Sequence, residues 1–154
     1  MRTELQVLNQ LKKVIVEQLK NYYAEDADNK DLLEDITEDN VAIDFPQLDS
    51  MKKNTMFYIQ PDYEEITDLS VSTDFASLNA SVFIMCKGFK NEILVKKVFG
   101  FYTALYALLR NNQTLDGYVD FTGITNSDYY PAVTASTTMT AIEASVRIDF
   151  AKCF

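Results

Sequence analysis

Four carboxylates in the middle of the chain are the first candidates for chemistry: Asp62, Glu64, Glu65 and Asp68. Two neighbouring carboxylates of unequal pKa can act as general acid and base, as in glycoside hydrolysis. The chain has no tryptophan with which to line a sugar-binding cleft. A short polar segment between two apolar runs is typical of a solvated loop. We therefore interpret these residues as a polar turn and favour a non-enzymatic function over an acid–base enzyme.

Histidine is absent from the chain, which removes the commonest general base and metal ligand. The two cysteines, Cys86 and Cys153, lie far apart and form no CxxC pair, so a zinc site is not expected. Cys86 lies in an apolar, strand-like run and is predicted to be a small buried side chain. We expect a protein that is not an enzyme and needs no cofactor or metal, with a cysteine-based activity at Cys86 as a weaker alternative.

The segment from residue 24 to residue 40, AEDADNKDLLEDITEDN, is dense in carboxylates. A calcium-binding loop needs oxygen ligands at fixed spacing and a glycine at its sixth position. Asp26 and Asp28 match the first two ligand positions, but Lys30 stands at the third and Asp31 at the glycine position. Because runs of like charge are usually solvated, the segment is predicted to be an acidic linker.

The composition favours a single domain that spans residues 1–154, with 47% hydrophobic residues and a formal charge of −9. Such a charge disfavours binding to nucleic acid phosphates and to anionic lipid. No apolar run reaches the roughly 20 residues of a membrane helix, and the start MRTELQ does not resemble a signal peptide. We expect a cytoplasmic protein without nucleic acid or membrane partners.

Two helices are predicted from apolar residues that recur every three or four positions. The first follows a capping box formed by Thr3 and Gln6 and ends near Tyr23. The second runs from residue 91 to about residue 110 and is apolar nearly all round in its second half. That pattern indicates either the centre of the core or a helix that a partner also covers.

Strands are predicted where apolar and polar residues alternate. The clearest is residues 138–150, in which every second residue is apolar or β-branched. Turns are predicted at residues 76–77 and in the connection of residues 126–133. Together the elements indicate an α+β domain: a mainly antiparallel sheet, an N-terminal and a central helix packed on one face, and a long closing β-hairpin. The predicted strands are residues 41–45, 54–60, 69–75, 78–86, 118–125 and 138–150.

Lysines bracket the start of the predicted central helix, where positive charge is slightly unfavourable. Lys90, Lys96 and Lys97 are either scattered surface residues or partners for an acidic segment of a neighbouring subunit. Asp35 and Glu38 are the candidate acidic residues in the second case.

Two further groups are candidates for a subunit interface. Tyr129 and Tyr130 lie on the connection before the last strand and either contact a partner or fold back over the domain's own core. Arg147 shares one face of the last strand with Glu143 and Asp149. These three form either a surface ladder of ion pairs or a sheet face that contacts another subunit.

The order of these elements, with the N-terminal helix LNQLKKVIVEQL and the closing passage GITNSDYYPAVTASTTMTAIEASVRIDF, resembles the tail-terminator, or tail-completion, proteins of long-tailed bacteriophages. The resemblance implies a non-enzymatic virion assembly protein that forms a homo-oligomeric ring, usually a hexamer. Such a ring caps the tail tube and joins it to the head connector. The implied partners are the protein itself, the tail tube and the head-completion proteins, and the implied location is the host cytoplasm and then the virion.

The residues also allow a function of another class. A small soluble ligand-binding module of bacterial or prophage origin could hold a ligand in a pocket between the sheet and the central helix.

Overall fold

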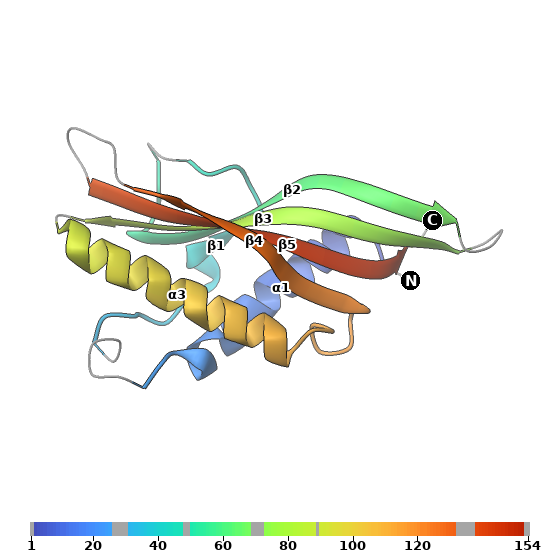
Figure 1. Ribbon diagram of the computed structural model, residues 1–154, viewed down its shortest axis with the longest axis horizontal. Coiled ribbons are helices and arrows are strands. Elements are labelled where there is room, and N and C mark those ends of the chain that lie inside the picture. The colour runs from blue at the N-terminus through green and yellow to red at the C-terminus, as the bar shows by residue number, and fades with distance from the viewer. Residues whose placement is uncertain are drawn as a thin grey trace.

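The described residues form a five-stranded sheet with the long helices α1 and α3 packed on one of its faces (Figure 1). The computed structural model describes residues 2–25, 31–47, 50–68, 73–88, 90–131 and 138–152. The predicted α+β class, with both helices on one face and a closing hairpin, is confirmed. The elements are α1 (Glu4–Gln18), η1 (Leu19–Tyr22), η2 (Glu38–Asn40), β1 (Val41–Ala42), β2 (Thr55–Asp68), β3 (Asp74–Gly88), α3 (Asn91–Asn111), β4 (Phe121–Tyr130) and β5 (Thr138–Lys152).

Helix α1 begins with the predicted capping box. The Thr3 amide donates to Gln6 Oε1 at 2.9 Å, and the Gln6 amide donates to Thr3 Oγ1 at 3.3 Å. Each bond satisfies a backbone donor that the first helical turn leaves without a partner. After Gln18 the chain tightens into the 3₁₀ turn η1, so the helical path ends at Tyr22, one residue before the predicted end.

Thr3→Ala is expected to lower the free energy of unfolding by about 1 kcal/mol, because it removes the hydroxyl that caps α1. Urea unfolding followed by circular dichroism measures this change. Thr3→Ser keeps the acceptor oxygen and is the control. Equal stability of the alanine variant and the wild type would show that the cap contributes nothing.

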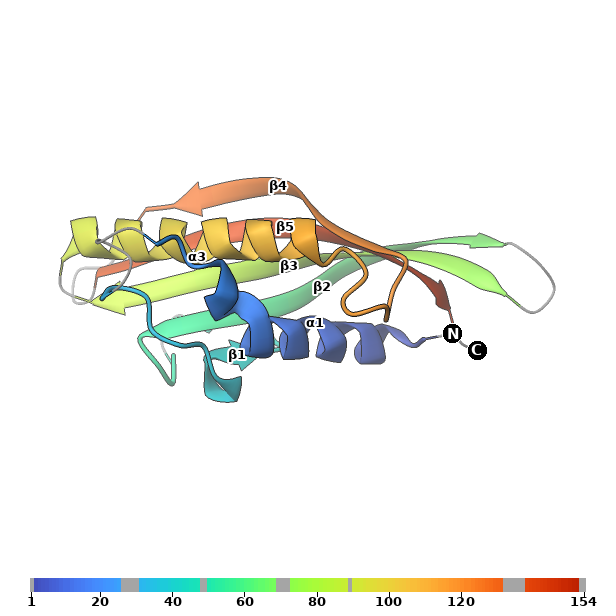
Figure 2. The same cartoon turned by 90° about the horizontal axis from the view of Figure 1, so that it is seen from below.

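The sheet has the order β1-β2-β3-β5-β4, and every neighbouring pair is antiparallel except β1 with β2. Side chains that alternate toward the helices form the main core, with Phe57 on β2 and Phe101 on α3 fully buried near its centre. A smaller cluster around Met85 covers part of the other face, which we call the outer face. Figure 2 shows α1 beside β1 and α3 beside β4 and β5, so each helix covers a different margin of the sheet.

The predicted end of a strand at Pro61 is wrong, because β2 continues to Asp68. The pairing of β2 with β3 shifts register between Pro61 and Tyr63, and β1 is paired with β2 only at Phe57 and Tyr58. Proline is tolerated at a register shift on a strand whose other edge is not paired at that level. The predicted turn of acidic residues is therefore part of a strand.

The predicted turn at residues 76–77 is also wrong. Ala76 pairs with Ile66 on one side and with Phe150 on the other, within the single strand β3. Pairing on both sides holds small residues in a strand where their own propensity is weak.

Two other segments differ from the prediction. The strand expected at residues 41–45 shortens to β1, and β4 runs on through half of the predicted connection, so Tyr129 and Tyr130 lie in a strand. Residues 26–30 of the acidic linker lie outside the described residues, as does Cys153. The described remainder of the linker is anchored on the core by the buried side chains of Leu33 and Ile36.

Candidate interaction surfaces

The carboxylates considered for acid–base chemistry point to different faces of the sheet. Asp62 accepts a hydrogen bond from Ser81 Oγ at 2.7 Å, whereas Glu64 Oε1 lies 2.7 Å from Lys152 Nζ. Glu65 lines a shallow hollow on the outer face. Adjacent residues of a strand alternate in direction, so Glu64 and Glu65 do not converge on one reacting group. Within the described ranges, no group of three or more histidine, cysteine, aspartate or glutamate side chains is placed to hold a metal ion.

Cys86 is fully buried on the helix-facing side of β3, as predicted. Burial raises the pKa of its thiol to about 12, and Thr55 Oγ1 lies 3.9 Å from its sulfur. The thiolate is the nucleophilic form of cysteine. At neutral pH this thiol is therefore protonated and out of reach of a substrate.

The ligand pocket considered between the sheet and the central helix is small. A cavity of about 90 Å³ lies between α3 and β4, with Tyr106 and Ile124 among its lining residues. Small-molecule sites usually occupy about 300–1,000 Å³. Elsewhere this layer holds buried apolar side chains such as Phe101 and Leu105, so the cavity between α3 and β4 is smaller than a usual ligand site. The ligand-binding module stays a prediction.

Arg147 forms the predicted ion pair within its own strand. Its Nε and Nη2 atoms donate to the two carboxylate oxygens of Asp149 at 3.0 and 2.8 Å, and Ser77 Oγ donates to Asp149 Oδ1 at 2.7 Å. These contacts raise the pKa of the Arg147 guanidinium through the hydrogen bonds and charge of Asp149. Half of the Arg147 side chain stays exposed, and its contact with another subunit remains a prediction.

The lysines at the start of α3 do not share one role. Lys97 Nζ lies 3.0 Å from Glu34 of the same chain, so the acidic segment and this helix are joined within the protomer. Lys96 Nζ lies 3.8 Å from Glu92, and both side chains are well exposed. Lys90 is exposed and occupies the N-cap position of α3 without a capping side-chain bond.

The two tyrosines project to opposite faces of β4. Tyr129 lies on the helix-facing side and packs on Phe99 of α3, with ring centroids 5.5 Å apart. Tyr130 lies on the outer face, where the charge of Glu143 raises the pKa of its hydroxyl. Both residues keep more than two fifths of their surface exposed. Tyr129 therefore extends an apolar surface that begins on α3, whereas Tyr130 lies on the opposite face of the sheet.

That surface follows the exposed side of α3, and we call it the α3 stripe. Phe99 and Tyr106 are 45% and 46% exposed, although the buried side of the same helix already supplies the core. Sequence reasoning proposed neither as a site residue, and the only signal was the nearly all-round apolar character of the helix. Successive members are three or four residues apart and so share one side of the helix. They are Lys96, Phe99, Thr103, Tyr106 and Arg110.

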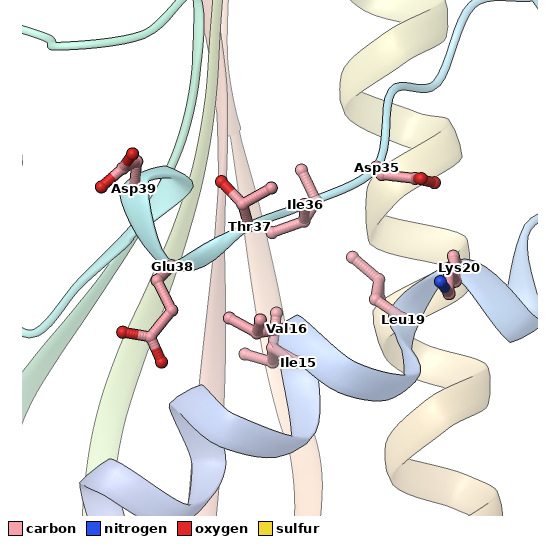
Figure 3. A pocket seen from close by; sticks show the side chains of 9 residues that line it. All are labelled: Ile15, Val16, Leu19, Lys20, Asp35, Ile36, Thr37, Glu38 and Asp39. Atoms are coloured by element: carbon pink, nitrogen blue, oxygen red, sulfur yellow. The ribbon is translucent and has the colours of Figure 1, made fainter.

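A second surface is an open pocket of about 440 Å³ between α1 and residues 35–39 of the acidic linker; we call it the α1 pocket (Figure 3). Ile15 and Val16 of α1 and Leu19 of η1 face Ile36 across it. Lys20 and Asp35 lie at one end and Glu38 and Asp39 at the other, so its rim carries three carboxylates and one ammonium group. Thr37 completes the lining. The pocket thus brings together the two predicted acidic site residues, Asp35 and Glu38.

Glu143, on β5 beside Tyr130, gives the outer face a testable pH dependence. Burial, with the nearby charges of Asp128 and Asp62, raises the pKa of its carboxyl. A carboxyl whose pKa is raised by folding stabilises the protein while protonated, and this contribution is lost as the pH rises through the folded-state pKa.

Glu143→Gln, which mimics the protonated form, is therefore expected to raise the melting temperature at pH 7 and to leave it unchanged at pH 3. Thermal unfolding across this pH range measures the difference, with the exposed Glu17→Gln as control. A Glu143 variant that is less stable at pH 7 would contradict this assignment.

No protein-family model matches the chain, and no curated protein matches it. One solved structure with a similar chain is the virion of a native gene transfer agent (GTA) particle, with a TM-score of 0.39 and 10% sequence identity. The match covers 73% of this chain and 78% of that chain. None of the described helices is long and apolar enough to cross a membrane.

Proposed function

We propose that this chain is a non-enzymatic virion assembly protein, a tail terminator whose homo-oligomeric ring caps the tail tube and joins it to the head connector. The observation that carries the proposal is the α3 stripe, where Phe99 and Tyr106 stay exposed on a helix that already buries its other side. Exposed aromatic side chains gathered on one surface mark protein–protein contacts. The sequence resemblance to tail terminators supplies the kind of assembly.

Two further features support a role through contact. The nucleophile and carboxylates that could do chemistry are buried or held apart, as at Cys86 and at Glu64 and Glu65. Among the described strands, β4 pairs with β5 alone and leaves its other edge open beside the α3 stripe. An open edge offers backbone hydrogen bonds to a neighbouring chain. A ring needs such a surface on every subunit.

The proposed partners are other copies of the chain, the tail tube and the head-completion proteins. The protein would assemble in the host cytoplasm and remain at the head–tail junction of the virion. In this role the ring contains six copies of the chain.

The test is to polymerise the tail-tube subunits of the genome that encodes this chain, with and without the purified protein, and to measure tube lengths by negative-stain electron microscopy. We expect shorter tubes with added density at one end. Unchanged lengths and bare tube ends would exclude a tail terminator. Heat-denatured protein at the same concentration is the control.

A further inference from the structure

We infer that the α3 stripe of one copy seats in the α1 pocket of the next copy, and that this contact closes the ring. The inference rests on the proposed function and names the two surfaces that such an assembly joins.

The two surfaces complement each other in charge and polarity. The stripe places two aromatic rings between the cations Lys96 and Arg110, which lie about 21 Å apart along the helix. The floor of the α1 pocket is apolar, with Val16 partly exposed beside the buried side chains of Ile15, Leu19 and Ile36. Its rim carries more carboxylates than cations. Glu38 and Asp39 lie at the end away from Lys20 (Figure 3). An apolar centre with charges of opposite sign around it is the usual anatomy of a specific interface.

Orientation within the protomer excludes a contact between a stripe and its own pocket. Phe99 of the stripe turns toward β4 and packs on Tyr129, whereas Lys97 on the other side of α3 turns toward Glu34, just before the pocket wall. Figure 2 shows α1 and α3 over opposite margins of the sheet. A stripe therefore reaches a pocket only on another copy.

This arrangement also fits a ring rather than a two-fold dimer. The stripe and the pocket are different surfaces, so their contact is heterologous. An open chain of copies keeps one free stripe at one end and one free pocket at the other until the ring closes. A two-fold dimer would instead place the same surface of both copies in contact.

Two variants separate the surfaces. The stripe variant carries Phe99→Asp and Tyr106→Asp, and the pocket variant carries Glu38→Lys and Asp39→Lys; all four side chains are exposed, so the fold is expected to persist. Each variant alone is expected to raise the dissociation constant of the assembly by at least about 30-fold, the effect of losing one interface hot spot. Leu5→Asp, at a position 61% exposed on α1 outside both surfaces, is the matched control.

Mixing the two variants gives the decisive result. The stripe variant retains a pocket and the pocket variant retains a stripe, so native mass spectrometry should show one-to-one heterodimers and no larger species. A third variant tests the same contact without aspartate substitutions. The variant with Lys96→Glu and Arg110→Glu is expected not to assemble. Assembly is expected to return when Glu38→Lys and Asp39→Lys are added to the same chain.

The other outcomes overturn the inference. If both surface variants form rings like the wild type, another surface makes the contact and the proposed function stands. If they are monomeric but neither the mixture nor the charge exchange restores binding, these two surfaces do not meet. If the wild type itself never assembles, the proposed function fails as well.

Discussion

Phe101→Ala is expected to lower the free energy of unfolding by about 3–5 kcal/mol, the range for truncation of a large buried aromatic side chain. Phe101 is fully buried where α3 packs on the sheet. Its ring meets those of Phe57 and Tyr23 edge to face, at centroid distances of 5.7 and 5.9 Å. The substitution removes contacts with Phe57 of the sheet and with Tyr23, which follows η1. Urea unfolding followed by circular dichroism measures the loss.

Phe99 provides the matched control, because it is a phenylalanine two residues away on the exposed side of the same helix. Phe99→Ala is expected to change stability by less than about 1 kcal/mol at protein concentrations where the chain is monomeric. Equal losses of unfolding free energy at the two positions would mean that Phe101 does not face the core while Phe99 faces solvent.

Asn112→Ala is expected to lower the free energy of unfolding by about 1–3 kcal/mol, because it removes three side-chain hydrogen bonds, of which the one to Gln18 is partly buried, and a typical hydrogen bond contributes about 0.5–1.5 kcal/mol. Asn112 Nδ2 donates to Gln18 Oε1 at 3.1 Å and to Asp116 Oδ1 at 2.9 Å, and its Oδ1 accepts from the Asp116 amide at 2.8 Å. These bonds tie α1 to the turn that follows α3. Thermal and urea unfolding measure the effect.

The turn itself explains why this asparagine matters. Leu115 and Asp116 have positive φ values of 49° and 62°, a left-handed backbone that is unfavourable for residues with side chains. In that conformation the Leu115 side chain is fully buried, and its carbonyl accepts a hydrogen bond from Gln10 Nε2 at 3.0 Å. Asn112 holds the strained turn in place.

Asn111→Ala is the control for this prediction. The Asn111 side-chain amide donates to the Ala107 carbonyl of its own helix at 2.8 Å, and the residue is exposed. Alanine has the higher helix propensity, so this variant should be as stable as the wild type or slightly more stable. A loss as large as that of Asn112→Ala would show that the tertiary bonds are not the cause.

Local signals predicted the helices well. The capping box joins Thr3 and Gln6, which are three residues apart. The apolar residues of α1 and α3 recur every three or four positions, a spacing of about one helical turn. Such interactions depend only on neighbouring residues. The sequence therefore carries them almost completely.

Strand boundaries were harder to predict because they depend on distant partners. Pro61 looks like the end of a strand unless it is known that β1 pairs with β2 only at Phe57 and Tyr58, which leaves that edge of β2 unpaired at the proline. Ala76 looks like a turn residue unless its pairing with both neighbouring strands is known. The polar residues that precede Tyr129 likewise read as a loop, yet their pairing with β5 extends β4 to Tyr130. In each case the sheet overrides local propensity.

The candidate interface was predictable only in part. The acidic residues Asp35 and Glu38 were named from charge, and Tyr129 from its neighbouring tyrosine. Phe99 and Tyr106 were missed as candidate interface residues, since an apolar residue on a helix looks like a core residue until the side of the helix that packs on the sheet is known. The pairing of Lys97 with Glu34 within one chain likewise depends on the tertiary fold.

The most direct test of the account is the mass of the purified wild-type protein in solution. Sedimentation velocity and native mass spectrometry over a wide concentration range should show one closed assembly, a hexamer, without a ladder of larger species. A chain that stays monomeric at the highest concentration would contradict the claim that this protein works through contacts between its own copies.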